Sequence, residues 1–151
     1  MAFFGNSVQP SAPGTTNDVM TLTGANGRKA RIVEISVCGL GTSSAANELG
    51  VKRPGNVGIT PTNQASVPLD PDCGSCSATV ATGWTTQPSL GTVAILRLGC
   101  NSNGAIYRWV ATPGMEIVVR GDSLTSHGQV SMRFTTGGAG AMGVHLVFEE
   151  F

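Results

Sequence analysis

The feature of this sequence that most limits its fold is a two-residue alternation of apolar and polar side chains, broken at short intervals by Gly, Pro or Asn. Near the carboxyl end, Met142, Val144, Leu146 and Phe148 would share one face of a strand. The same alternation recurs along the chain, and no window shows the 3.6-residue period of an amphipathic helix. The expected strands are 19–22, 31–37, 49–53, 78–81, 93–98, 105–110, 115–120, 130–135 and 142–149. This pattern predicts an all-β fold, an antiparallel β-sandwich of jelly-roll type.

Three turns punctuate these strands. The segment 24–27 and the pair Asn103-Gly104 each lie between two expected strands, and Asn-Gly readily adopts the positive φ values of a tight turn. We therefore expect each turn to join its two flanking strands as a β-hairpin. Pro113-Gly114 fits the central pair of a type II turn.

The length of 151 residues suits one domain, which we place at residues 17–151. Residues 1–16 carry Gly and Pro without sustained alternation, and we expect them to form an extended amino-terminal arm outside the core. Phe3 and Phe4 would give this arm an apolar tip for binding a partner, because burying an aromatic ring is favourable. The alternative is that the arm folds back over its own domain, and the sequence leaves both open.

Charge excludes several classes of function. Nine basic and nine acidic residues cancel to a net charge of +0, which argues against binding nucleic acid through phosphate contacts. No apolar run is long enough to cross a bilayer, and the first residues do not resemble a secretory signal. We expect a chain made in a cytoplasm, with its four cysteines as thiols rather than disulfides: Cys38, Cys73, Cys76 and Cys100. A disulfide stays open as the alternative.

Few residues suggest chemistry. The motif around Ser123, Gly-Asp-Ser-Leu, is the short signature of a class of serine esterases, but no Asp-x-x-His block follows it, so a polar turn is favoured. Cys73 and Cys76 have metal-ligand spacing, but zinc would also need Cys38 and Cys100. Asp70 and Asp72 are too few for calcium and indicate a turn. We expect no catalytic residue, metal or cofactor.

Aromatic and imidazole side chains leave further alternatives. Trp84 and Trp109 could stack on a sugar ring, but in a small sandwich they more often fill the core or an interface. His127 lies among Ser and Gly and is expected to be solvated. His145 is expected on the outward face of the last strand.

Six short stretches form an ordered pattern through most of the chain. They are ARIVEISV at 30–37, LDP at 69–71, WTTQP at 84–88, GAIYRW at 104–109, PGMEIVV at 113–119 and VFEE at 147–150. In this order they resemble the small jelly-roll proteins that decorate or cement the capsids of tailed bacteriophages. Neither the Cys73/Cys76 pair nor the Ser123 motif belongs to the pattern.

The resemblance implies a virion structural protein without enzymatic activity, made in the host cytoplasm and located on the capsid surface. It implies a homotrimer seated on the lattice of the major capsid protein, where it would stabilise the head against packaged DNA. One rival is a tail, fibre or host-attachment module that binds through residues 39–92. Two others are a small esterase that uses Ser123 and a sugar-binding sandwich that uses Trp84 or Trp109.

Overall fold

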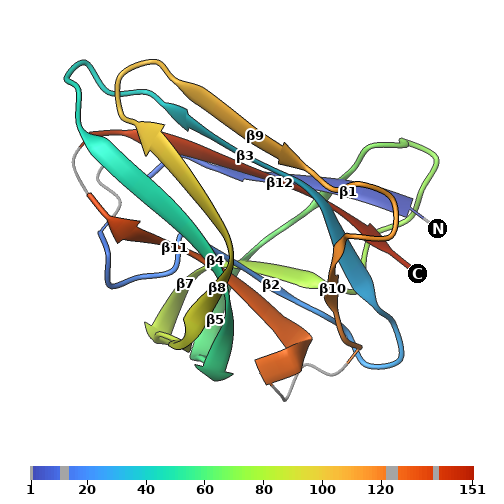
Figure 1. The fold of residues 1–151 in the computed structure, drawn as a ribbon. Helices are drawn as coiled ribbons and strands as arrows, with labels where there is room; N and C mark the ends of the chain where they lie inside the picture. Colours follow the sequence, from blue (N-terminus) through green and yellow to red (C-terminus); the bar gives the residue numbers. More distant parts are fainter. Residues whose placement is uncertain (1, 11–13, 122–125, 138–139) are drawn as a thin grey trace.

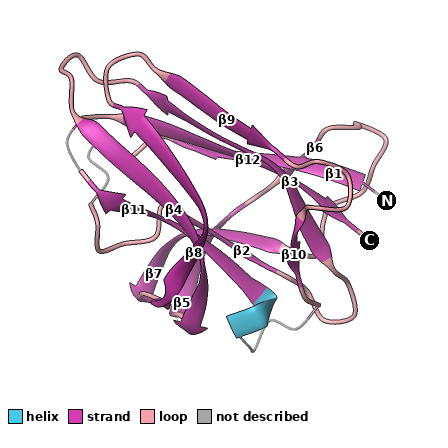
Figure 2. Ribbon diagram, in the orientation of Figure 1, coloured by secondary structure: helices cyan, strands magenta, loops and turns pink. Residues whose placement is uncertain are grey.

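A computed structural model describes residues 2–10, 14–121, 126–137 and 140–151. Two antiparallel β-sheets pack face to face, and the described residues include no α-helix (Figures 1 and 2). The one helical element in those ranges is a short 3₁₀ helix, η1 (Ser126–Gly128). No helix in the described part of the chain is long and apolar enough to span a membrane. The predicted all-β sandwich is confirmed.

Each sheet has six strands. The first sheet has the order β10-β3-β12-β1-β6, and β9 also pairs with β3. The bounds of its strands are β1 Ala2–Val8, β3 Ala30–Gly39, β6 Val67–Pro68, β9 Ile106–Val110, β10 Ile117–Val119 and β12 Met142–Glu150. The second sheet has the order β5-β7-β2-β11-β4-β8. The bounds of its strands are β2 Met20–Thr23, β4 Ala46–Asn56, β5 Ile59–Gln64, β7 Thr79–Thr86, β8 Ser89–Asn101 and β11 Gln129–Thr136.

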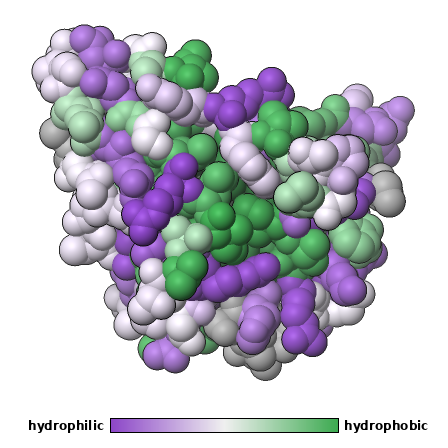
Figure 3. Space-filling view, in the orientation of Figure 1, coloured by the Kyte–Doolittle hydropathy of each residue, from purple (hydrophilic) through white to green (hydrophobic). Residues whose placement is uncertain are grey.

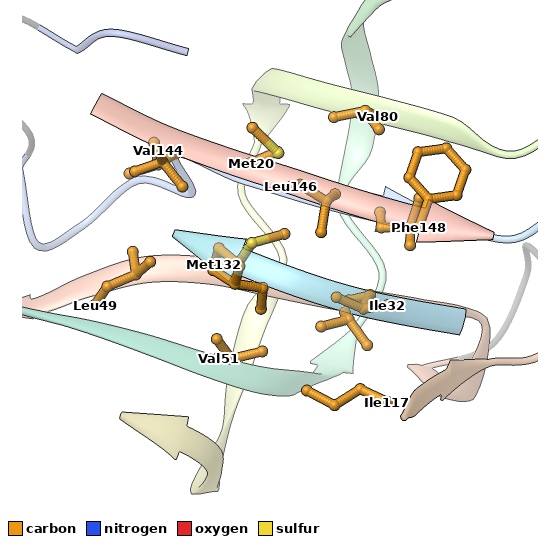
Figure 4. Packing of buried hydrophobic residues seen from close by; sticks show 14 of the residues in the cluster. Met20, Ile32, Leu49, Val51, Val80, Ile117, Met132, Val144, Leu146 and Phe148 are labelled. Carbon is orange, nitrogen blue, oxygen red and sulfur yellow. The ribbon is translucent and has the colours of Figure 1, made fainter. Parts of the chain in front are cut away.

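All nine expected strands overlap an observed strand, and seven of them supply buried side chains to the core. The other two, 93–98 and 105–110, only pack the partly buried Leu96, Leu98 and Trp109 against it. In β12 the four alternating side chains predicted to share a face are buried, none more than 1% exposed. Figure 4 shows three of them, Val144, Leu146 and Phe148, opposite side chains of the second sheet, which include Met132 of β11 and Leu49 of β4. Each such side chain contributes roughly 1.5–3 kcal/mol when it leaves water. The two-residue period therefore assigned the core face of this strand correctly.

The two predicted hairpins are wrong. The turns do form, and Gly104 has a φ of +76°. However, β8 lies in the second sheet beside β4, and β9 lies in the first sheet beside β3. The strands β2 and β3 are likewise divided between the sheets. A turn reverses the chain locally, but it does not decide whether the next strand hydrogen-bonds to the last one or crosses to the opposite layer.

The arm expected at residues 1–16 is wrong for residues 2–8, which form β1. This strand pairs with β12 through seven consecutive residue pairs, from Ala2 opposite Glu150 to Val8 opposite Val144. Phe4 is 2% exposed, and its ring stacks on Phe148 with centroids 5.6 Å apart. The alternative, in which the segment folds back over its own domain, describes these residues. Strand β12 gains a hydrogen-bonded neighbour and the core gains an aromatic ring.

Strand β4 is longer than expected. The sequence predicted an end at Arg53 because Pro54 and Gly55 follow, but β4 continues to Asn56. Strand β11 pairs with β4 only as far as Lys52, and beyond it β4 has β8 as its one neighbour in the described residues. The register with β8 shifts on both sides of Pro54. Proline is tolerated in an edge segment because the side of the strand without a neighbour needs no N–H donor.

Candidate functional site

The two lateral sides of the sandwich differ. On one side the chain crosses from β5 to β6, and Asn6 donates from its side-chain amide to the carbonyl oxygen of Ala65 at 3.3 Å. This crossing covers the space between the sheets. On the other side, β8 of the second sheet faces β9 and β10, which follow one another along β3. Figure 1 shows β8 and β9 diverging from their shared turn.

An apolar groove of about 290 Å³ occupies this side. Its lining residues come from β8, β9, β10 and the turn between the last two: Ile95, Leu96, Trp109, Val110, Thr112, Met115 and Ile117. Met115 is 73% exposed, and Ile117 at the base is buried. Figure 3 shows hydrophobic side chains gathered in a hollow in the middle of this face. We call the groove and the exposed edges of β8, β9 and β10 beside it the open edge.

Two irregularities of the chain shape the groove. Strand β8 has a bulge at Ile95, because Val51 pairs with Leu96 while the next residue, Lys52, pairs with Ala94. A bulged residue is turned away from its regular direction, which accounts for Ile95 lining the groove. The turn between β9 and β10 places Met115 at the mouth.

That turn is the one predicted at Pro113-Gly114. Met115 donates its N–H to the carbonyl oxygen of Thr112 at 2.8 Å, and Gly114 has a φ of +87°. A positive φ at the third residue is what a type II turn requires, so the prediction is confirmed.

Two arginines of the strands that border the groove are paired with carboxylates. Arg108 of β9 donates two hydrogen bonds of 2.6 Å to the carboxylate of Glu34. These bonds hold the pKa of Glu34 below its ordinary value of 4.5. Arg97 of β8 lies 2.9 Å from Glu48 in the same way. The groove is thus an apolar surface on strands that also carry two ion pairs.

Arg53 closes one end of the open edge. Its guanidinium donates to the carbonyl oxygens of Val118 in β10, His127 and Gln129, and so links the two sheets. Burial lowers the pKa of Arg53 from its ordinary value. Charged hydrogen bonds to three carbonyl groups fix this corner, so that the opening lies between the corner and the turn that joins β8 to β9.

The two predicted contact residues, Phe3 and Phe4, have different positions. Phe4 belongs to the core, so its side chain is not available to a partner, which corrects that expectation. Phe3 points to the other face of the sheet and is 43% exposed. It lines a shallow cavity of about 280 Å³ together with Leu69 and Cys73. Phe3 is therefore outside the buried core and remains partly exposed at the surface.

The four cysteines do not gather at one point. Cys38 in β3 pairs with Gly143 near the start of β12, whereas Cys73 lies beside Ala2, which pairs with Glu150 at the end of β12. Seven residues of a strand span about 23 Å, far more than one zinc ion can bridge. All four are free thiols. Burial raises the pKa of Cys100 to about 11 and also raises that of Cys76, which keeps these thiols protonated.

Trp84 is held by its surroundings. Its indole N–H donates to the Thr21 hydroxyl at 3.2 Å, and that hydroxyl donates to Asp18 at 2.7 Å. A β-carbon added to Gly58 would lie 2.4 Å from the Trp84 ring, so the glycine packs directly on the indole. These contacts favour the structural interpretation of Trp84 over sugar stacking. Trp109 lines the groove.

The remaining candidates are not brought together. Ser123 lies outside the described residues. His127 is exposed in η1, and His145 is half-buried on the outward face of β12, as the alternation predicted. The N–H of Asp72 donates to the Asp70 carboxylate at 3.0 Å, which is the turn expected there. Within the described ranges, no three His, Cys, Asp or Glu side chains form a group that could hold a metal ion.

The open edge is the feature that sequence reasoning missed. Its one local signal is Met115, a large apolar residue directly after a turn, where a polar residue is usual. The groove itself depends on which strands form the edges of each sheet. No protein-family model matches the chain, and no curated protein or solved structure matches it.

Proposed function

We propose that this chain is a structural protein of a tailed bacteriophage, a capsid decoration or cement protein that binds the major capsid protein and stabilises the head. The observation that carries the proposal is the open edge. An apolar groove offers area for protein contact, and exposed apolar patches of this kind mark interaction sites. A virion surface protein works by such contact, repeated over many copies.

The resemblance names the partner, which is the major capsid protein. The sequence stretches that carry the resemblance also lie close together in the fold. Four of the six stretches lie in β3, β9, β10 and β12, which are neighbours in the first sheet. The strand order also supports the jelly-roll type. Strand β12 lies between β3 and β1, while β11 lies between β2 and β4, so the last two strands insert between earlier ones in opposite sheets. Interleaving of this kind is typical of a double Greek key.

The described polar groups support binding over catalysis. The buried acids are engaged in holding the fold: Asp18 pairs with Arg133 at 2.6 Å, and Glu150 accepts the backbone N–H groups of Ser77 and Ala78. Asp18 also lines a cavity of about 350 Å³, but its carboxylate oxygens are already bound by Arg133 and by the Thr21 hydroxyl. A catalytic carboxylate would instead be free to reach a substrate in such a cavity. The homotrimer, the seat on the capsid lattice and the virion location are parts of the same proposal.

The experiment that tests it is a count of copies. Virions purified from the phage that encodes this chain are analysed by quantitative mass spectrometry, with the major capsid protein as internal standard. Hundreds of copies per particle support a shell component. A handful would favour the tail, fibre or attachment alternative, and none would overturn a virion role.

A binding assay complements the count. Heads that lack the chain are incubated with the purified protein and sedimented, and their resistance to heat or chelator is then compared with that of undecorated heads. A cement protein co-sediments at saturation and raises the temperature at which heads release DNA. Hydrolysis of a short-chain ester that disappears in Ser123→Ala would instead favour the esterase alternative.

A further inference from the structure

We infer that strand β9 binds an extended strand of a partner protein, which pairs with it antiparallel and adds to the first sheet. Figure 1 shows β9 at the margin of that sheet, and β9 pairs with β3 alone in the described part of the chain. The inference goes beyond the proposed function, because it names the kind of segment that a partner contributes.

The hydrogen bonds that flank β9 show which of its backbone groups are free. The carbonyl oxygen of Ala105, directly before β9, accepts the N–H of Gly39 at 3.0 Å. Ala111, directly after β9, donates its N–H to Val33 at 2.8 Å. In an antiparallel pair, residues bonded to the neighbouring strand alternate with residues whose N–H and C=O groups point away from it. The residues of β9 whose groups point away from β3 are therefore Ile106, Arg108 and Val110.

The ligand that fits this row of groups is an extended backbone. Three N–H donors and three carbonyl acceptors lie along an exposed strand, and none has a hydrogen-bond partner among the residues that the structure describes. An extended chain presents its own N–H and C=O groups at the same two-residue spacing, so one short segment can bond to all three residues. A helix cannot do so, because its backbone groups are already bonded within it.

The other edges of the two sheets are protected against strand addition. Strand β6 is two residues long and ends in Pro68, and β5 contains Pro61 and shifts its register with β7. The register of β8 with β4 shifts three times. In β10 the carbonyl oxygen of Val118 already accepts a hydrogen bond from Arg53. Short edges, prolines and bulges prevent pairing with another chain, whereas β9 pairs with β3 over five consecutive residues without a shift.

The side chains of β9 indicate the sequence of the partner strand. On the outer face of the sheet, Arg108 lies between the exposed Ile106 and Val110, because alternate residues share a face. Apolar residues opposite the two aliphatic side chains and an acidic residue opposite Arg108 would stabilise the pair. The guanidinium of Arg108 keeps donors beyond the two that bind Glu34. On the inner face, Trp109 lines the groove, so the intervening partner residues are expected to be apolar.

The same row of residues disfavours a second copy of this chain as the partner. Two copies of β9 related by a two-fold axis pair all three residues of each only in the register centred on Arg108. That register places Arg108 directly opposite its own counterpart, and like charges in this position destabilise a strand pair. The remaining edges of a second copy are the protected ones. A strand of different sequence can instead place a carboxylate opposite Arg108.

The test uses backbone methylation to detect strand pairing. The probe is a synthetic peptide with the central sequence Val-Leu-Glu-Leu-Val, capped at both ends and flanked by Thr and Lys for solubility. Its Glu would lie opposite Arg108, so the Val and Glu amides bond to β9 while the two Leu amides point away. N-methyl groups on the Val and Glu amides should abolish binding. N-methyl groups on the two Leu amides should leave the affinity within about threefold.

Amide hydrogen exchange of the full-length protein, followed by NMR, locates the contact. The amides of Tyr107 and Trp109 bond to β3 and are expected to exchange slowly with or without peptide. The amides of Ile106, Arg108 and Val110 should exchange rapidly in the free protein and about tenfold or more slowly at saturating peptide.

Variants of β9 provide a second measurement. Ile106→Pro removes one outward N–H, and the fold should tolerate it because proline suits the first residue of a strand. It should weaken peptide binding by about tenfold, whereas the matched control Ile106→Thr keeps the N–H and should change binding by less than about threefold. Melting temperatures show whether both variants are folded. Replacing the peptide Glu by Lys should weaken binding by about fivefold.

Three results would overturn the inference: no binding of the unmethylated peptide at about 1 mM, binding of the peptide methylated on Val and Glu, or protection confined to amides outside residues 106–110. These results are separate from those of the proposed function. Strand pairing by a chain that is absent from virions keeps the inference and overturns the function. Hundreds of copies per virion without peptide binding overturn the inference alone.

Discussion

Replacing Phe4 by Ala is expected to destabilise the domain by about 3–5 kcal/mol, the range for losing a fully buried Phe. The ring is 2% exposed and stacks on Phe148 at 5.6 Å, with 27° between the planes. Truncation removes the burial of the ring and leaves a cavity between the sheets. The amino-terminal strand would thereby lose its one large anchor in the core.

The measurement is equilibrium unfolding in urea at pH 7, followed by the fluorescence of Trp84 and Trp109 at one fixed protein concentration. Thermal unfolding should agree, because for a chain of this size each 1 kcal/mol lowers the melting temperature by about 2–4 °C. The expected decrease is therefore about 6–20 °C. The matched control is Phe3→Ala, which removes an adjacent ring that is 43% exposed and should cost less than about 1 kcal/mol.

Equal effects of the two substitutions would refute the reasoning. If Phe4→Ala and Phe3→Ala lowered the free energy of unfolding by the same amount within ~0.5 kcal/mol, β1 would not belong to the cooperative core. The segment would then behave as the detached arm that the sequence suggested. Deletion of residues 1–9 would in that case leave the melting temperature unchanged.

Three further predictions concern other sites. Gly39→Ala should destabilise the fold by about 1–3 kcal/mol in urea unfolding, because the added carbon would lie 2.2 Å from a backbone oxygen, whereas Gly99→Ala, with no atom within 4 Å, should be nearly neutral. Equal costs would contradict this. Cys100 should resist iodoacetamide at pH 8 in the folded protein and react after unfolding, as read by peptide mass spectrometry, since burial raises its pKa to about 11. Rapid labelling of the native protein would refute it. Arg108 lowers the pKa of Glu34, so their pairing stabilises above pH ~4.5 and is lost as pH falls further. Glu34→Gln should therefore show a smaller loss of stability between pH 7 and pH 3 than wild type, and an unchanged loss would contradict the pairing.

The revised position of Phe4 changes how capsid attachment should be tested. A Phe4 variant that fails to bind heads would report unfolding rather than loss of a contact. Surface variants such as Met115→Lys avoid this ambiguity, because their side chains are mostly in water in the single chain.

The alternation of apolar and polar residues located the strands well, because the face to which a side chain points is set within its own strand. In β12 and β11, alternate residues must point to opposite sides of the sheet, so the apolar members identify the core face without knowledge of neighbours. The turn at Pro113-Gly114 was predictable for the same reason, since Gly at the third position permits the positive φ observed there.

The pairing of strands could not be predicted in this way. Asn103-Gly104 favours a reversal of the chain, but after this turn the chain passes to the other sheet, so that β8 pairs with β4 and β9 pairs with β3. The incorporation of β1 depends on the free edge of β12, which is about 140 residues away along the chain. Contacts at such separation leave no mark in a short window of sequence.

The amino-acid sequence by itself determined that this chain forms a β-sandwich and which face of strands such as β11 and β12 enters its core, because alternation acts within each strand. Only the tertiary structure decided which strands end each sheet. The groove and the burial of Phe4 both follow from that choice, since each depends on partners brought together from distant parts of the chain.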